Sequence, residues 1–593
     1  MQAIRFINLI CSLICSLDGH LQALQEKARQ VLGRNANLKD RSAEGNRPMN
    51  TSLKKVVWII LCGTLVLSIV TALFQLRREK SVQQEVADSR RALREQGFKT
   101  DLAEFDFTTS PELRSRESAL IAFNPGMAAN PFNDHPDLMN PAGTDAAIVV
   151  WRQAWPRTEA DQILWPVLRQ AMEENRFALD AACAAALSGP IRFELEPRGG
   201  LGMLLRHLAP LKNLAQSLGS RTILELHFGN RDAAWTNLLA ESRLVIAWKP
   251  EPTEISQLVR FSFTKMAYAA TWQAMQFKGW TDYRLAQLQT EWESANFFTN
   301  LPATAAFKRA STVAMCEQML KEPPDFFGGS ASEFMKELVR SPRSAWSGVS
   351  HSWSEAGYRS HGVFVDEKDL LLYFQKREVE IRNAVQSSTW LQMRALPGVT
   401  NPAPFTSKYR SRLQSVLNLR ETGLAFQQGS MGLLGNAAET EARRRILVTA
   451  LALERYQIHY GTYPKTLAAL APEFLKVVPV DFMDGQPLRY RLADDSHFVL
   501  YSVGLDGVDD GGEMPPHGRP GRWATGMPGR ALTAEKDIVW PRPASAEETE
   551  AALQPEKFER ANGGHRRGSP DRRAMEPGRP TPGVRQQSPR AEI

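Results

Sequence analysis

The sequence predicts a mainly α-helical body, one N-terminal transmembrane helix and a small α+β domain near the C-terminus. Three observations predict this fold class. An uncharged apolar run occupies 56–76, apolar residues recur at three- and four-residue spacing through 146–430, and two short alternating segments lie at 488–492 and 497–504. With 43% hydrophobic and 23% charged residues, the composition resembles that of globular proteins, so the membrane part is small.

The 593 residues exceed a typical domain of roughly 100–200 residues, so we expect several units with linkers. In chain order these are an over-extended start or disordered leader at 1–48, a transmembrane anchor at 49–80, a stalk helix with an extended linker at 81–145, a helical body at 146–435, an α+β domain at 436–542 and a disordered tail at 543–593. The tail is poor in large apolar residues and rich in Pro, Gly and Arg, which is typical of disorder.

The run VVWIILCGTLVLSIVTALFQL between Lys55 and Arg77 is the predicted anchor. At a rise of about 1.5 Å, about 20 residues match a hydrocarbon core of about 30 Å. The run is longer than the apolar core of a signal peptide, and no small-residue cleavage site follows it, so we expect it to be retained. Met49 precedes a short charged segment typical of a translation start, and whether Met1 or Met49 begins the natural chain stays open.

Residues 81–97 form a polar stretch that predicts a stalk helix ended by Gly97. The next segment, from about residue 100 to 144, is predicted to be mostly extended because prolines interrupt it repeatedly, at Pro111, Pro125, Pro131, Pro136 and Pro141.

The body shows helices separated by short Gly or Pro turns. One helix is expected to end at Phe228, the turn GNRD follows at 229–232, and Thr253 and either Thr281 or Asp282 are expected to cap later helices. This order resembles tetratricopeptide-like hairpins, but no 34-residue period is sustained, so we expect a helical-hairpin domain rather than a repeat array. A plain helical bundle without a ligand is an equally good interpretation.

Several function classes find little support in the body. The net charge of +7 is spread over many segments without a recognition motif, which argues against nucleic-acid binding. Ser350, His351 and His361 suggest a hydrolase, yet no nucleophile motif accompanies them. A hydrolase site elsewhere in the body would have to use polar residues near apolar faces, namely His207, Glu225, His227 and Glu241. Cys183 and Cys316 either pair or stay as small buried hydrophobes.

The most specific pattern lies between about residues 439 and 540. A helix at 439–460 stops at Gly461, Tyr463-Pro464 opens a second short helix, and the motif VPVD ends at Asp481. Two segments, LRYRL and HFVLYSVG, predict an antiparallel hairpin. The loop GLDGVDDGGE follows, and DIVW at 537–540 closes the unit.

This ordered set resembles the C-terminal part of the major pseudopilin of type II secretion systems. It resembles more closely the pseudopilin-like ends of large envelope proteins in planctomycete- and verrucomicrobia-type bacteria, which combine an N-terminal anchor with a helical middle. Two departures are clear: Phe482 stands where family members often have Pro, and the helix at 439–460 lacks the apolar pilin N-terminus with its prepilin peptidase site. We therefore expect no polymerisation into a pilus.

In that family the acidic loop and the later Asp bind calcium. The resemblance implies that Asp506, Asp510 and Asp537 are side-chain ligands, with Asp509 and Glu513 as further candidates. Oxygen ligands and a glycine-rich loop also suit a hard cation, because the backbone can turn carbonyl groups inward. The alternative is a solvated acidic turn without a metal, since the EF-hand spacing is not met.

Together these patterns predict a non-enzymatic, single-pass inner-membrane protein of the cell envelope, with a helical interaction body and a calcium-stabilised pseudopilin-like cap. Its expected partners are membrane lipid, through residues 56–76, and other envelope proteins. Taken alone, the basic residues after the anchor would leave the body in the cytoplasm, but long C-terminal domains translocate largely regardless of such charge, and the resemblance favours the periplasm. The alternatives are a membrane-anchored hydrolase and an accessory protein of a type II secretion-like system.

Overall fold

The computed structural model describes residues 81–123, 139, 141–154, 156, 162–196, 203–321, 358–402, 405, 432–493, 496–514 and 537–553. The predicted leader and the apolar run 56–76 lie outside these residues, as do Ser350, His351 and residues 554–593. Among the described helices, none combines the length and apolar character that a membrane crossing requires.

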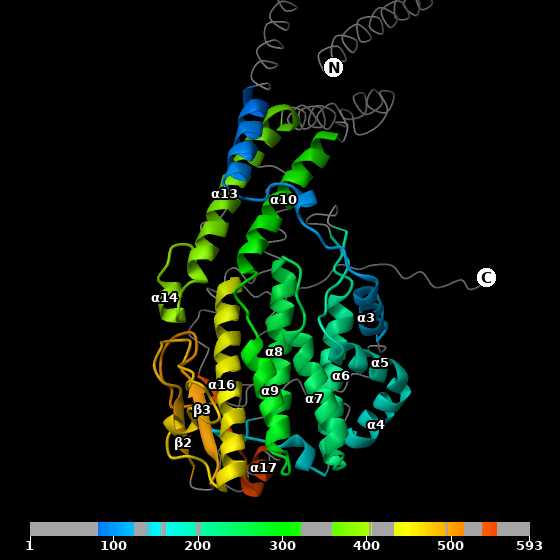
Figure 1. Cartoon of the computed structure of the whole chain (residues 1–593), viewed down its shortest axis with the longest axis vertical. Coiled ribbons are helices and arrows are strands. Elements are labelled where there is room, and N and C mark those ends of the chain that lie inside the picture. The colour runs from blue at the N-terminus through cyan, green and yellow to red at the C-terminus, as the bar shows by residue number, and fades with distance from the viewer. Residues whose placement is uncertain are drawn as a thin grey trace, which may run out of the picture.

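Helices build most of the described structure, in agreement with the mainly α-helical body that the sequence predicts (Figure 1). The body contains α4 (Leu164–Glu174), α5 (Arg176–Leu187), α6 (Leu208–His227), α7 (Arg231–Ile246), α8 (Glu254–Met275) and α9 (Asp282–Ser294). Two predicted caps are confirmed: the Thr253 hydroxyl accepts from the Ser256 N–H at 3.2 Å, and the Thr281 hydroxyl accepts from the Arg284 N–H at 3.4 Å. The predicted turn between α6 and α7 contains Gly229 at φ +77°, a conformation that glycine adopts at little cost.

A neck extends from the body at the end away from the β-sheet (Figure 1). It consists of the helical residues 81–95, α10 (Leu301–Lys321) and α13 (Val363–Ala384). Arg90 joins all three helices, because its Nη1 lies 2.8 Å from Glu317 Oε1 and its Nε donates to Glu367 Oε1 at 2.6 Å.

The lower part of the neck contains a fully buried charge. Arg309 of α10 is 0% exposed, its Nη1 lies 2.8 Å from Glu378 Oε2 of α13, and its Nε donates to the Lys99 carbonyl oxygen at 2.7 Å. The same guanidinium lies over the Phe98 ring. Residues 98–99, just after the stalk helix, are therefore held by the hairpin of α10 and α13.

The C-terminal segment combines one long helix with a small sheet. The helix α16 (Gly432–Tyr460) packs against α8 and α9. The sheet is antiparallel, in the order β2 (Arg489–Leu492), β3 (Phe498–Ser502) and β4 (Ile538–Trp540). β2 and β3 form the predicted hairpin, and Arg489 pairs with Tyr501. One continuous hydrophobic cluster includes residues of the body, of α16 and of this sheet.

Two side chains of helix α8 hydrogen-bond to the backbone at and just after β4 and thereby join the sheet to the body. The Tyr268 hydroxyl donates to the Val539 carbonyl oxygen at 2.9 Å, and Trp272 Nε1 donates to the Pro541 carbonyl oxygen at 2.8 Å. Because these polar atoms are buried, the hydrogen bonds satisfy groups that an apolar neighbour would leave unpaired.

Several segments differ from the sequence prediction. Within 100–144, predicted as extended, the helix α3 (Pro111–Ala122) begins after Ser110, whose hydroxyl accepts from the Leu113 N–H at 3.3 Å. The predicted second short helix is a single 3₁₀ turn at Leu467–Leu470. β5 (Arg542–Pro543) pairs in parallel with β1 (Ala146–Ala147), and α17 (Ala546–Leu553) follows, so residues 543–553 are ordered and the prediction of disorder needs correction there.

Candidate functional sites

The acidic loop after β3 contains backbone conformations with positive φ, which glycine adopts at little cost. Four glycines adopt φ between +63° and +77°: Gly504, Gly507, Gly511 and Gly512. At Gly512 a Cβ atom would lie 2.8 Å from a ring carbon of Tyr501, so the close packing of the loop on β3 also requires glycine.

Asp537, at the start of β4, faces this loop with a partly unsatisfied carboxylate. Its side chain is buried at 6% exposure, and Oδ2 accepts from the Gly512 N–H at 2.8 Å. Oδ1 is buried and has no hydrogen-bond partner among the described residues. Burial raises the pKa of Asp537 to about 6, although the N–H groups of Gly512 and Asp510 oppose this shift. A cation would satisfy the free oxygen, since an unpaired buried acceptor is costly.

Two other predicted ligands have protein partners. Asp506 Oδ1 accepts from the Val508 N–H at 3.1 Å. Asp509 Oδ1 accepts from the Gly511 N–H at 3.0 Å and from the Tyr501 hydroxyl at 3.1 Å. The hydrogen bond from Gly511 keeps the pKa of Asp509 below its usual value. Asp509 Oδ2 also lies 3.4 Å from Arg489 Nε, so a metal would compete with Arg489 for this carboxylate.

The residues therefore fit a metal in part. Within the described chain, no group of three His, Cys, Asp or Glu side chains gathers closely enough to hold an ion. The Asp510 N–H is close enough to the Asp537 carboxylate to oppose the rise of its pKa, and Asp537 Oδ1 has no hydrogen-bond partner among the described residues. The Asp506 and Asp509 side chains serve the loop itself.

Asp481 positions the start of this loop, a role that the sequence analysis missed. Its carboxylate is 0% exposed, and it accepts hydrogen bonds from the Ser502 hydroxyl at 2.7 Å, the Met483 N–H at 2.8 Å and the Val503 N–H at 3.0 Å. These bonds fix the end of β3 against the turn at 481–485. The sequence signal for this role is the acidic residue Asp481 within the otherwise apolar segment VPVDF.

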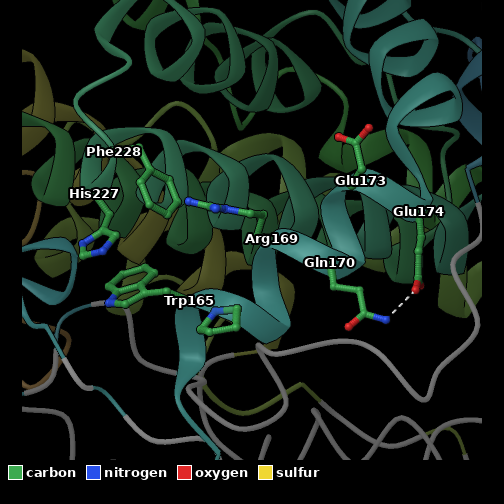
Figure 2. Close-up of a pocket in the computed structure, with 8 residues that line it drawn as sticks. Trp165, Arg169, Gln170, Glu173, Glu174, His227 and Phe228 are labelled. Carbon is green, nitrogen blue, oxygen red and sulfur yellow. Dashed lines mark hydrogen bonds between the residues drawn. The ribbon is translucent and has the colours of Figure 1, made fainter.

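A pocket lies between α4 and the C-terminal end of α6 (Figure 2). This pocket has a volume of about 770 Å³, is open to solvent and is lined by Trp165, Pro166, Arg169, Gln170, Glu173, Glu174, His227 and Phe228. Its size falls within the range of roughly 300–1,000 Å³ typical of small-molecule sites.

Planar groups stack along one wall of the pocket. The Trp165 and His227 rings lie 4.0 Å apart at 10°, and His227 Nδ1 donates to the Trp151 carbonyl oxygen at 2.8 Å. The Arg169 guanidinium carbon lies 4.0 Å from the centroid of the Phe228 ring. The sequence analysis did not single out Trp165 or Arg169, although their four-residue spacing places them on one face of α4.

His207 and Glu241, both suggested for a hydrolase, are buried far inside the fold. His207 Nε2 lies 3.1 Å from Glu251 Oε1, and each side chain is 3% exposed, with the His207 ring stacked on Phe193. Glu241 is 1% exposed, and neither carboxylate oxygen has a hydrogen-bond partner among the described residues. Burial raises the pKa of Glu241 well above its ordinary value.

Glu225 and His227 do not complete a catalytic pair with the other acids. Glu225 Oε2 accepts from Asn230 Nδ2 at 2.7 Å, next to the turn after α6. Figure 2 shows Glu173 and Glu174 at the opposite end of the pocket from His227. The four residues suggested by the sequence therefore lie in separate environments.

The two cysteines of the body are free and buried, in different hydrophobic clusters. Burial raises the pKa of the Cys183 thiol to about 11, which makes it a poor nucleophile at neutral pH. Of the loop residues suggested for a hydrolase, His361 lies in a short π-helical segment, Tyr358–Gly362, directly before α13.

Comparison with known proteins adds no relative to these observations. No protein-family model, no curated protein and no solved structure matches this chain.

Proposed function

We propose that the chain is a non-enzymatic, single-pass inner-membrane protein of the cell envelope, with a helical body for protein contacts and a calcium-stabilised pseudopilin-like cap. One observation carries the proposal: the apolar run ends at Leu76, and residues 81–95, which follow closely, are tied into the neck by Arg90. Five residues span at most about 17 Å. An anchor at 56–76 would therefore keep the neck beside the membrane.

The arrangement of the elements supports a cap that is presented away from the bilayer. The sheet of β2, β3 and β4 and the lower end of α16 lie at the end of the described structure opposite the neck (Figure 1). With the body on the periplasmic side, the sheet would face the envelope, where protein partners are reached.

The non-enzymatic role is favoured by the environments of the titratable groups in the described residues. A hydrolase needs a base and an acid or nucleophile that converge on one substrate atom. His207 packs between Phe193 and Trp248. Glu241 is buried without a hydrogen-bond partner among the described residues, and His227 lies apart from the acids of its pocket.

The anchor is tested by carbonate extraction of membranes that contain the full chain. We expect the chain to stay in the membrane pellet and to be released when a protease site inserted after residue 80 is cut. A variant that lacks 49–76 should be soluble, and a matched deletion of 554–593 should stay in the pellet. Membrane retention of the variant without 49–76 would show that another segment is the anchor.

Calcium at the acidic loop is supported by Asp537 Oδ1, which has no hydrogen-bond partner in the part of the chain that the structure describes. A ligand that binds the folded state stabilises it by about 2.7 kcal/mol at a hundredfold excess over Kd. Calcium should raise the melting temperature of the full chain, and magnesium should raise it less because it tolerates an irregular oxygen cage poorly.

The variants Asp537→Asn and Asp510→Asn should each lose the calcium-dependent rise in melting temperature, whereas Asp232→Asn, on the exposed side of α7, should keep it. The rise is the quantity to compare, since removing the charge of Asp537 changes the metal-free stability by itself. Equal melting temperatures of the natural chain with calcium and with a chelator would identify the loop as an ordinary acidic turn.

A further inference from the structure

We propose that the open pocket between α4 and α6 binds a carboxylate carried by an apolar group, with Arg169 as the anion-binding residue. The proposal goes beyond the envelope role and requires neither the anchor nor calcium. It rests on the unused guanidinium of Arg169, on the apolar wall beside it and on the charge at the far end of the pocket.

Arg169 is prepared for a bidentate anion. Its guanidinium carbon lies over the Phe228 ring, 4.0 Å from the centroid, and among the described residues the group has no carboxylate or carbonyl partner. Neighbouring arginines differ, since Arg221 lies 2.5 Å from Asp180 and Arg176 lies 3.6 Å from Glu173. A stacked guanidinium presents its N–H groups as a planar fork, which matches the two oxygens of a carboxylate.

The wall beside Arg169 suits an apolar group. Phe228 is a large aromatic residue that remains 42% exposed, Pro166 is exposed beside it, and the largely buried Trp165 also belongs to the lining. The volume of about 770 Å³ accommodates an aromatic or branched side chain together with its carboxylate. The stack with His227 and the bond of His227 to Trp151 hold this wall in place.

The acids at the other end restrict the ligand to a low negative charge. Glu173 and Glu174 are exposed and lie within the same lining, so a phosphate ester or a polyanion would meet like charges there. A single carboxylate next to Arg169 avoids that repulsion. Such a group occurs on a free aromatic acid and at the C-terminus of a peptide that ends in an apolar residue.

The experiment is calorimetric titration of the full chain, purified in detergent, with four probes. Phenylacetate and the peptide Gly-Gly-Leu-Phe carry the carboxylate, whereas phenylacetamide and the C-terminally amidated peptide lack it. We expect both acids to bind and both amides to bind at least about tenfold more weakly, because a charge-assisted hydrogen bond is lost. Tighter binding of phenylacetate or of the free-acid peptide identifies the source of the carboxylate.

Variants assign the binding to Arg169. Arg169→Gln should weaken the acids about tenfold or more and leave the amides unchanged, and Arg169→Lys should retain part of the affinity. The matched control is Arg284→Gln, which removes an arginine over an aromatic ring, Trp235, outside the pocket lining. Glu174→Gln should strengthen binding of the acids, which provides a gain that misfolding would not produce.

Three outcomes would overturn the proposal. Acids and amides of equal affinity would show that the charge is not recognised. Unchanged binding to Arg169→Gln or no binding of either acid at millimolar concentration would remove Arg169 and the pocket from consideration. Competition by inorganic phosphate as strong as that by phenylacetate would indicate a general anion site.

Discussion

Lys265 of α8 and Glu439 of α16 form an ion pair between the body and the C-terminal segment, with Lys265 Nζ 2.9 Å from Glu439 Oε2. Arg443 Nη1 lies 2.7 Å from the other carboxylate oxygen. Glu439 is 5% exposed, and although burial opposes it, the pairing with Arg443 and Lys265 keeps the pKa of Glu439 below its usual value. Charge therefore adds to the apolar contacts that join α8 to α16.

Replacing Glu439 by Gln should destabilise the fold, because two cations would then face each other without an anion. Loss of one member of a buried pair costs about 3–5 kcal/mol, and we expect about 2–3 kcal/mol here since Lys265 is partly exposed. The melting temperature measures this effect. As the control, Asp232→Asn removes an exposed partner of Arg284 and should change stability by less than about 1 kcal/mol. Equal effects of the two substitutions would contradict the role of Glu439.

The neck should depend on Glu378 in a similar way. Glu378→Gln leaves Arg309 buried without a counter-charge and should loosen residues 98–99, which Arg309 holds through the Lys99 carbonyl oxygen and the Phe98 ring. Hydrogen exchange should therefore become faster in peptides from 81–105 than in peptides from α6 or α7. The control Glu380→Gln changes another acid of α13 whose partners Lys376 and Arg377 lie on the same helix. Unchanged exchange in 81–105 would show that Glu378 does not hold the stalk.

Glu454 provides a prediction for pH. Burial raises the pKa of Glu454 to about 7, although the hydrogen bond from the Tyr463 hydroxyl at 2.9 Å opposes the shift. Because the folded state binds this proton more tightly than the unfolded state, the contribution of Glu454 to the free energy of unfolding is greatest below about pH 4.5. This contribution is lost as the pH rises through about 7. The loss is at most about 3.5 kcal/mol at about 1.4 kcal/mol per pKa unit, and less because the side chain is only half-buried.

Glu454→Gln keeps an oxygen that accepts from Tyr463 and removes the titration. The melting temperature of this variant should therefore fall less between pH 5 and pH 8 than that of the natural chain. The exposed acid Glu473, which accepts from Tyr460, provides a matched control as Glu473→Gln. Parallel pH profiles of the natural chain and Glu454→Gln would exclude Glu454 as the titrating group.

Local signals in the sequence predicted the features that neighbouring residues decide. Thr253 and Thr281 lie directly before apolar helices, and the caps are where the sequence predicts them. Ser110 before Pro111 is also a local signal for the start of a helix, but the repeated prolines of 100–144 favour extended structure, and α3 was therefore not predicted. Strand pairing between β1 and β5 joins residues almost 400 positions apart, and no local pattern indicates it.

The candidate sites likewise combine features that the local sequence indicates with features that depend on tertiary structure. The resemblance indicated Asp537, but the environment of its carboxylate, with Oδ2 bonded to Gly512 and Oδ1 without a hydrogen-bond partner among the described residues, follows from tertiary structure. Arg169 was not predicted as a binding residue, because its suitability for an anion depends on Phe228, which lies at the end of a different helix, α6. A guanidinium without an acidic partner is recognised only when all its neighbours are known.

Glu241 should lower the stability of the natural chain at neutral and alkaline pH. It lies between α6 and α7, where a Cβ at Gly219 would be 3.2 Å from both of its carboxylate oxygens. Burial raises the pKa of Glu241, so ionisation is resisted by the fold, and stability falls as pH rises from about 4.5 towards the raised pKa. Replacement by Met, of similar length and without a charge, should remove this cost.

We therefore expect Glu241→Met to raise the melting temperature, by more at pH 8 than at pH 5. The control Glu174→Met makes the same substitution at an exposed position of α4 and should leave the pH profile unchanged. The gain in melting temperature should be larger at pH 8 because the natural chain loses stability when Glu241 ionises. The variant has no carboxyl group at this position and does not lose stability in this way. A lower melting temperature of Glu241→Met at both pH values would show instead that the carboxyl group forms a stabilising contact inside the helix pair.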